Sequence, residues 1–255
     1  ILHTNDTEVL MLDIRKLEEI SMNAWPGVYV RFYDGWVMRC AGGYTNRANS
    51  ILPLYESRED LMRKINEAER FCSSRGLQTI FKMTSISLPS ELDRALESQG
   101  YVERDRAIVL TKELSGATRD LSDLDIFTTP SREWLGSFTR LSKKAAENEH
   151  WLGRILDSIV PDAYYLILKK SEEAVGCAMA VREDEYFGLF GITIGQEYRR
   201  MGYGKELTEK LMALGGREGA RVAYLQVDIV NDVAIKLYSS LSFEEAYQYW
   251  YRVKV

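Results

Sequence analysis

The alternation of strand-like and helix-like segments over residues 186–254 constrains the fold most strongly. Leu207, Leu211 and Leu214 recur at helical spacing, and Gly219 is suitably placed to stop that helix. In chain order the segments predict a strand at 186–194, a helix at 204–218, a strand at 221–230, a helix at 232–241 and an aromatic-rich strand at 243–254. Strands that alternate with helices indicate an α/β (α+β) fold, in which a mixed central sheet is flanked by helices.

The segments before this run extend the same domain. A strand is expected at 125–129, a helix at 132–149 with Trp134 and Phe138 on one face, and strands at 162–170 and 174–183. The acidic turn Glu183-Asp184-Glu185 joins the last of these strands to the one at 186–194. This order predicts an antiparallel meander that leads into the alternating segments.

The first half of the chain is similar in pattern to the end of the second half. A helix is expected at 59–75, Gly76 stops it, and a strand is expected at 77–84. The segment from Glu91 to Leu110 then parallels the segment from Val233 to Val253, since each predicts a helix, a glycine or serine, an aromatic residue and a strand. We interpret this as a weak internal duplication with an offset of roughly 142 to 146 residues. The alternative is a chance similarity between two αβ units.

A polar segment, Glu113 to Asp123, separates the two apolar-patterned regions and contains Gly116. The length of 255 residues and the hydrophobic content of 45% allow one large domain or two of ordinary size. The polar segment favours two domains, at residues 1–114 and 120–255.

Charge, histidines and cysteines exclude several kinds of function. The net charge of −5 argues against a general nucleic-acid-binding surface. No apolar run approaches the roughly 20 residues that a bilayer span needs. His3 and His150 are the only histidines, and Cys40, Cys72 and Cys177 have no paired spacing. We expect reduced thiols, no metal, no nucleic-acid or membrane partner and a cytoplasmic location, and a homodimer stays open.

The loop Arg199-Arg200-Met201-Gly202-Tyr203-Gly204 stands between an expected strand and an expected helix. Glycines let backbone N–H groups converge on an anion, and a helix N-terminus adds unpaired N–H groups and the positive end of its dipole. Arg199, Arg200 and Lys205 cluster where that dipole disfavours cations, and a bound polyanion would reverse the penalty. The alternative is a tight turn with solvated arginines.

Two motifs carry a resemblance to a known family. The Arg199 to Gly204 segment matches the R/Q-x-x-G-x-G/A signature of the GNAT superfamily of N-acetyltransferases. Asn231-Asp232-Val233-Ala234-Ile235-Lys236-Leu237-Tyr238, followed by Phe243, resembles that family's N-x-x-A-x-x-L-Y-x-x-x-G-F segment. The likeness covers Asp125 to Val255. Asn23-Ala24-Trp25-Pro26, Asp34-Gly35-Trp36 and the closing Tyr247 to Arg252 are similar to segments of two-domain GNAT proteins of undefined substrate, which implies a degenerate GNAT-like N-terminal domain.

The resemblance implies a sheet splayed in its middle and acetyl-CoA as co-substrate. The expected contacts to its pantetheine arm are Ile192, Thr193 and Ile194, although their side chains also suit core packing. The expected contacts to its phosphates are Arg199, Arg200, Met201, Gly202, Tyr203, Gly204 and Lys205. Asn231 is expected to contact the CoA arm, to cap the next helix, or both. Tyr238 is expected to protonate the departing sulfur, with a buried core tyrosine as the alternative.

Two positions depart from the family pattern. Ser242 stands where a glycine is common, which should be harmless if the backbone there avoids positive φ. Gly188 aligns with a frequent acidic position, so the obvious general base is missing. Glu185, Asp228 and Glu149 are the acidic residues nearest to substrate-facing positions, and none of them is assigned as the base.

The expected function is acetyl-CoA-dependent transfer of an acetyl group to a primary amine of a small molecule or peptide. The alternatives are a non-catalytic CoA-binding regulator and a transferase similar to the Fem-type tandem GNAT proteins. The first half has Arg47 and Asn49 but no paired glycines before its helix, so we expect one CoA site per chain. Trp25, Trp36 and Tyr44 are its candidates for acceptor-site walls, with core packing as the alternative.

Overall fold

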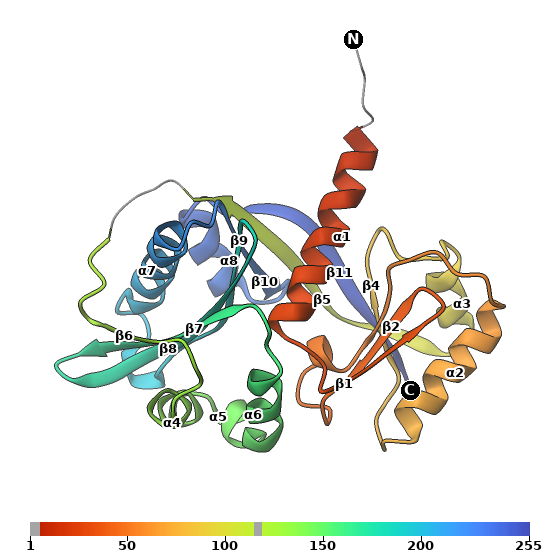
Figure 1. Cartoon of the computed structure of the whole chain (residues 1–255), viewed down its shortest axis with the longest axis horizontal. Helices are drawn as coiled ribbons and strands as arrows, with labels where there is room; N and C mark the ends of the chain where they lie inside the picture. The colour runs from red at the N-terminus through yellow and green to blue at the C-terminus, as the bar shows by residue number, and fades with distance from the viewer. Residues whose placement is uncertain (1–5, 115–118) are drawn as a thin grey trace, which may run out of the picture. The chain divides into compact units, whose positions relative to one another are not determined.

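The computed structural model describes residues 6–114 and 119–255, and the chain divides into two compact units of mixed α/β structure (Figure 1). Unit 1 is Ile1–Ile108 with Ala246–Val255, and unit 2 is Val109–Glu245. The predicted linker includes residues 115–118, which, like His3, lie outside the described residues. The predicted domain bounds 1–114 and 120–255 stay a prediction.

Unit 1 is built on a mixed sheet in the order β1-β2-β3-β4-β11-β5. Its elements are α1 (Asp6–Ala24), β1 (Tyr29–Tyr33), β2 (Trp36–Cys40), the 3-10 turn η1 (Asn46–Ala48), β3 (Ile51–Pro53), α2 (Leu61–Ser73), β4 (Ile80–Met83), α3 (Leu92–Ser98), and parts of β5 (Tyr101–Glu113) and β11 (Glu244–Lys254). β3 and β4 are parallel, whereas β4 and β11 are antiparallel. A core that includes Trp36, Met38, Ile51, Phe81 and Tyr101 joins these strands to α2.

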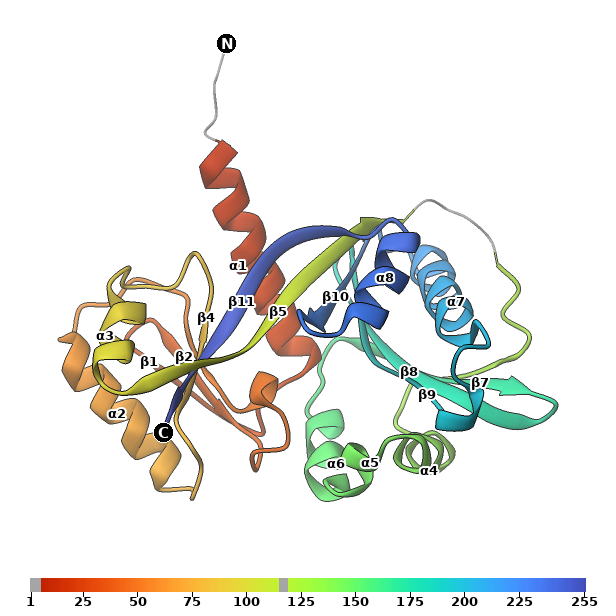
Figure 2. The ribbon, with the colours of Figure 1, turned by 180° about the vertical axis from the view of Figure 1, so that it is seen from behind.

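Unit 2 has the order β5-β10-β9-β8-β7-β6. Its further elements are β6 (Leu124–Phe127), α4 (Arg132–Leu141), α5 (Lys143–Ala146), α6 (Glu149–Asp157), β7 (Asp162–Lys170), β8 (Glu173–Glu183), β9 (Tyr186–Ile194), the 3-10 turn η2 (Gln196–Tyr198), α7 (Tyr203–Arg217), β10 (Val222–Asp228) and α8 (Asp232–Ser240). Figure 2 shows α7 and α8 on one side of the sheet and α4, α5 and α6 on the other. The mixed sheets flanked by helices confirm the predicted fold class.

The predicted strands at 162–170 and 186–194 have the bounds of β7 and β9. The single helix predicted at 132–149 is wrong, because Ser142 has extended backbone angles, φ −127° and ψ 102°. Its hydroxyl accepts a hydrogen bond from Ala145 N at 3.4 Å, which starts α5 as a separate turn. Helices α1 and α6 were not predicted from the sequence.

Both halves of the chain contain the same order of elements. β3-α2-β4-α3-β5 in the first half corresponds to β9-α7-β10-α8-β11 in the second. In each set the first two strands pair with each other in parallel, and a helix connects them along the chain. The helices α2 and α7 therefore occupy equivalent places in the two sets, and their N-termini can be compared directly.

Candidate active site

The strands β9 and β10 pair along only part of their length. Their parallel register runs from Tyr186↔Val222 to Gly188↔Tyr224 and ends there. On the other side β9 stays paired to β8 through Thr193 and Ile194, after a β-bulge at which Gly191 has φ +59°. Because this end of β9 has a strand partner on one edge only, its other edge can pair with the amides of a ligand.

Helix α7 begins just beyond this end of β9. Gly202 caps it in the left-handed region, with φ +86°, and a Cβ built on Gly202 would meet no atom within 4 Å. Glycine is therefore required by the backbone conformation, and the space beside it is open. No side chain caps this helix, so its first N–H groups remain available to an anion.

The charge around this N-terminus is positive. Arg199, Arg200 and Lys205 are exposed, and among the described residues none of them forms a salt bridge. The carboxylate of Glu206, in the first turn, instead pairs with Lys170 at 2.7 Å. Met201 is 59% exposed, so its side chain does not pack into the core. The backbone donors and the unpaired cations together fit a polyanion such as a pyrophosphate.

The start of α7, the end of β9 and helix α8 meet at Gly204. A Cβ built there would lie 3.6 Å from Leu237 Cδ2 and 3.8 Å from Ile194 Cγ1, which are ordinary van der Waals contacts. Tyr238 follows Leu237 on α8. The two sequence motifs, far apart in the chain, are thus brought together.

Tyr238 is 9% exposed, and its ring packs edge-on against Phe243 with centroids 5.8 Å apart. Burial raises the pKa of Tyr238 to about 12, so the hydroxyl is protonated at neutral pH. Among the described residues this hydroxyl has no hydrogen-bond partner. Asn231 caps α8, because its Oδ1 accepts a hydrogen bond from Ala234 N at 3.1 Å. The amide nitrogen of Asn231 remains for a ligand.

The family often has an acidic residue at the position of Gly188, and here other side chains fill the space beside this glycine. A Cβ on Gly188 would lie 2.5 Å from Phe190 Cε2 and 2.6 Å from the Tyr224 hydroxyl oxygen. Tyr224 therefore lies where β9 and β10 stop pairing, and sequence reasoning missed it. Only the strand register connects residues 188 and 224, so no motif indicated this tyrosine.

None of the three acidic candidates for the base lies at the end of that pairing. Glu185 precedes β9 and pairs with Arg221 at 3.3 Å. Asp228 accepts a hydrogen bond from Val230 N at 3.1 Å and shapes the turn before α8. Glu149 is the exposed first residue of α6. The general base stays unassigned.

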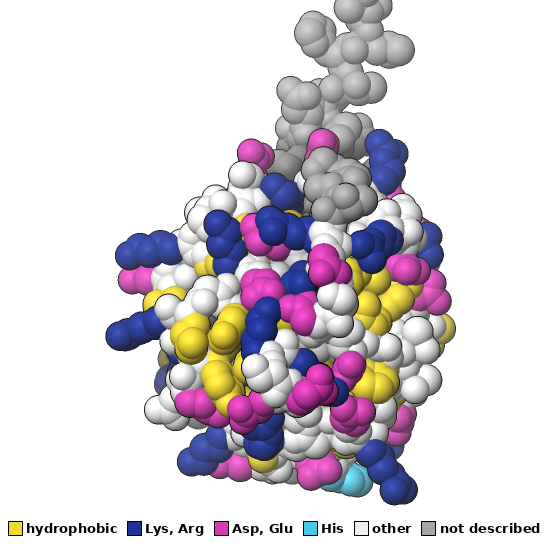
Figure 3. Space-filling model, turned by 90° about the vertical axis from the view of Figure 1, so that its left-hand side faces the viewer, with side chains coloured by type: hydrophobic (Ala, Val, Ile, Leu, Met, Phe, Trp, Pro, Cys, Tyr) yellow, Lys and Arg dark blue, Asp and Glu magenta, His cyan; other side chains and the backbone are white. Residues whose placement is uncertain are grey.

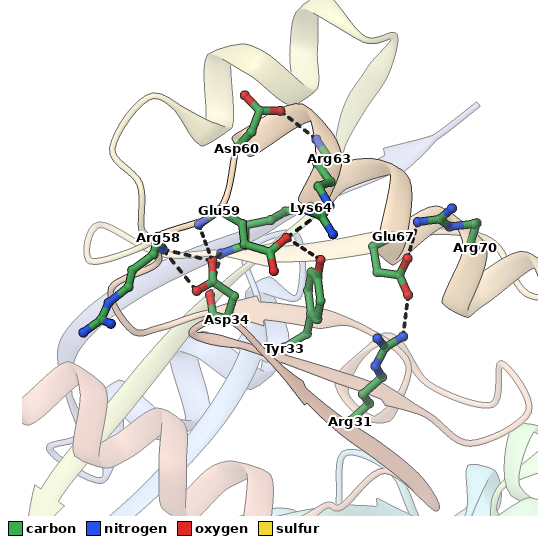
Figure 4. A network of polar contacts seen from close by, with 10 residues as sticks. All are labelled: Arg31, Tyr33, Asp34, Arg58, Glu59, Asp60, Arg63, Lys64, Glu67 and Arg70. Atoms are coloured by element: carbon green, nitrogen blue, oxygen red, sulfur yellow. Dashed lines mark hydrogen bonds and ion pairs between the residues drawn. The ribbon is translucent and has the colours of Figure 1, made fainter.

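The N-terminus of α2, the counterpart of α7, is surrounded by carboxylates (Figure 4). Asp60 caps α2 by accepting a hydrogen bond from Arg63 N at 3.0 Å. Asp34 accepts from the backbone of Arg58 and Glu59, and these hydrogen bonds keep the pKa of its carboxyl below the ordinary value. The start of α2 thus has a carboxylate cap, which the start of α7 lacks.

The proposed wall residues of the first half are buried. Trp36 is a core residue, and its indole N–H donates to Leu88 O at 3.1 Å. Trp25 and Tyr44 pack together with ring centroids 6.3 Å apart. Trp36 thus fits the core-packing alternative.

A family model described as "Probable histone acetyltransferase Rv0428c C-terminal" matches residues 12–252. The chain belongs to this family. Two relatives are the Uncharacterized N-acetyltransferase YobR of Bacillus subtilis, 29% identical over 96% of this chain and 100% of YobR, and the Probable histone acetyltransferase Rv0428c of Mycobacterium tuberculosis, 29% identical over 87% of this chain and 68% of Rv0428c.

Solved structures share the fold at low sequence identity. A GCN5-related N-acetyltransferase from Kribbella flavida has a TM-score of 0.64 and 13% identity, covering 93% of this chain and 95% of its own. A tandem GNAT protein from the clavulanic acid biosynthesis pathway has a TM-score of 0.58 and 11% identity, covering 99% and 97%. This chain thus shares the fold of GNAT proteins, including a tandem one, and it is an acyltransferase of the N-acetyltransferase type.

The structure adds three observations on partners and metals. No helix among residues 6–114 and 119–255 has the length and apolar content to cross a bilayer. On the face shown in Figure 3 acidic and basic side chains are interspersed, and no continuous basic stripe is visible. In the same described part of the chain no group of three or more His, Cys, Asp or Glu side chains is arranged to hold a metal ion.

Proposed function

We propose that this protein transfers the acetyl group of acetyl-CoA to a primary amine of a small molecule or peptide. The observation that carries the proposal is the N-terminus of α7. It joins a glycine in the left-handed region, uncapped N–H groups and three unpaired cations at the end of a strand with a free edge. In the proposal Arg199 to Lys205 hold the CoA phosphates, Ile192 to Ile194 pair with the pantetheine arm, and Asn231 contacts that arm.

Direct transfer requires a neutral amine that attacks the thioester carbonyl carbon. A carbon–nitrogen bond forms as the carbon–sulfur bond breaks. The nitrogen releases one proton to water, and the sulfur leaves with the bonding electrons and must gain a proton. Tyr238 donates that proton in this proposal. Burial raises the pKa of Tyr238 to about 12, so its hydroxyl carries a proton at neutral pH.

The names of relatives support an amine on a peptide or protein as one form of the acceptor. Over 58 residues the chain is 40% identical to the [Ribosomal protein bS18]-alanine N-acetyltransferase of Escherichia coli, covering 39% of that enzyme. The Mycobacterium tuberculosis relative is named a probable histone acetyltransferase. Both names describe transfer to a protein amine.

The test is turnover of acetyl-CoA against a panel of small amines and of peptides with free N-termini or lysines. Release of the CoA thiol and the mass of the product are measured together. We expect at least one amine to gain a single acetyl group with equal release of CoA. Binding of acetyl-CoA without transfer to any amine in the panel would instead favour a non-catalytic CoA-binding protein.

A further inference from the structure

A row of polar side chains crosses the sheet of unit 1 on the face opposite its main core. The neighbouring residues Met38, Ile51, Phe81 and Met83 belong to the core, and side chains alternate along a strand. Arg39 on β2, Ser50 before β3 and Lys82 on β4 therefore lie on the other face. Arg39 N donates to Ser50 O at 3.2 Å, and Lys82 pairs in register with Tyr251 on β11. All four residues of this row are buried.

Among the side chains that the structure describes, one buried carboxylate lies near this row, and other groups use it fully. Glu18 of α1 is 0% exposed and accepts two hydrogen bonds from Lys82 Nζ, at 2.6 and 2.7 Å. It also accepts one from the Tyr247 hydroxyl at 2.6 Å. The Lys82 ammonium lies 3.9 Å above the Tyr249 ring. Glu18 and Lys82 thus neutralise each other.

Arg39 is a second buried cation near Glu18. It is 5% exposed, and its guanidinium donates to two backbone carbonyls, Trp25 O at 3.3 Å and Arg47 O. Among the described residues it forms no salt bridge, and its Nε is buried without a hydrogen-bond partner. Burial lowers the pKa of Arg39 to about 10 although the charge of Glu18 opposes this shift, and the guanidinium stays charged at neutral pH. Glu18 thus faces two buried cations, and its single charge balances only one of them.

Three buried hydroxyls accompany this guanidinium. Ser21 Oγ on α1 and Ser50 Oγ have no hydrogen-bond partner in the described part of the chain, and the Tyr251 hydroxyl lies beside the Tyr249 hydroxyl. Burial raises the pKa of Tyr251 well above the ordinary value, so its hydroxyl remains a donor. In the strand order β2-β3-β4-β11, Ser50 lies between Arg39 and Lys82, and Tyr251 is next to Lys82. Ser21 comes from the helix that carries Glu18. Water could satisfy the donors, but it could not balance the charge of Arg39.

We propose that unit 1 binds one small monovalent anion, of the size of chloride or formate, against Arg39 Nε and the neighbouring hydroxyls. Such an anion supplies the missing counter-charge and accepts the N–H and O–H donors at once. The site lies within unit 1 and does not depend on acetyl transfer. Its expected effect is on the stability of this unit, since an anion that binds only the folded protein stabilises it by mass action.

The deciding experiment is a crystal of the full chain grown in sodium bromide, with anomalous scattering recorded at the bromine edge. We expect a bromide peak in contact with Arg39 Nε and at least one of the hydroxyls of Ser21, Ser50 and Tyr251. A water molecule at this position with no anomalous signal would overturn the proposal. Bromide peaks found only on the molecular surface would overturn it as well.

Thermal unfolding in solution gives a second, independent readout. At constant ionic strength, replacing gluconate with chloride or formate should raise the melting temperature of the wild type. Arg39→Met should lose this dependence, whereas Arg94→Met, which removes an exposed arginine of α3, should keep it. Equal melting temperatures in the three salts for the wild type would overturn the proposal. If Arg39→Met does not fold, the wild-type salt series and the bromide map still decide whether the anion binds.

Discussion

Ser242 holds a backbone conformation that suits glycine. Its φ is +60°, in the turn where Phe243 N donates to Tyr238 O at 3.1 Å and closes the end of α8. The expectation that Ser242 is harmless required a backbone that avoids positive φ, and that condition is not met. A Cβ in the left-handed region is strained, which costs about 1 to 2 kcal/mol.

Ser242→Gly should therefore raise the free energy of unfolding. The gain is expected to be about 0.5 to 1 kcal/mol, because the extra freedom of glycine in the unfolded chain offsets part of the relieved strain. Urea unfolding measures it. The matched control is Ser239→Gly within α8, which should lower stability by about 0.5 kcal/mol. A loss of stability in Ser242→Gly would show that the turn is not strained.

Tyr238→Phe removes the proposed acid with little change in volume. We expect kcat to fall by about tenfold or more while the Kd for acetyl-CoA stays nearly constant. Tyr164 is a matched control, because it is also 9% exposed and burial with the Glu218 hydrogen bond raises its pKa to about 12 as well. Tyr164→Phe should keep kcat. Equal kcat values for the wild type and Tyr238→Phe would show that Tyr238 is a core packing residue and not the acid.

The raised pKa of Tyr238 also predicts a pH profile. An acid works while it is protonated, so its contribution is lost only as pH rises through the folded pKa of about 12. Between pH 7 and 10 we therefore expect no loss of kcat from ionisation of Tyr238 in steady-state rates. A fall in kcat near pH 10 that disappears in Tyr238→Phe would contradict this assignment.

At the scale of elements, α2 and α7 show how similar positions diverge. Asp60 caps α2 with a carboxylate, whereas Gly202 leaves the start of α7 without a side-chain cap. Sequence spacing was sufficient to find the α7 loop, since its glycines and arginines are contiguous. It could not show that β9 and β10 stop pairing at Gly188, or that Tyr224 fills the space beside it, because these features depend on register between distant segments.

The positive charge of the α7 loop predicts a salt-dependent affinity. Arg199→Gln combined with Arg200→Gln should weaken acetyl-CoA binding by about two- to fivefold per charge, the range for exposed ion pairs, and should flatten its dependence on salt. Titration at two ionic strengths measures both effects. Lys143→Gln, on the exposed α5 helix, serves as the control and should leave both unchanged. An unchanged salt dependence in the double variant would place the phosphates elsewhere.

At the scale of the whole molecule, the sequence predicted the last strand, β11, but not the strand with which it pairs. Trp250 to Val253 of β11 pair with β4, so the last strand of the second half completes the sheet of unit 1. The ion pair between Glu18 and Lys82 likewise joins residues far apart in sequence. The apolar periodicity predicted most of the strands and helices, but it carries no information on which strand is the neighbour of which.

The central claim is a single acetyl-CoA site per chain at the start of α7, and calorimetric titration of the full chain tests it most directly. We predict one bound acetyl-CoA in the wild type and none in Gly202→Val, since a branched residue cannot take φ +86° without moving the backbone donors. Gly216→Val, at an open position on the same helix, should bind as the wild type does. A stoichiometry of two, or wild-type binding by Gly202→Val, would contradict the account.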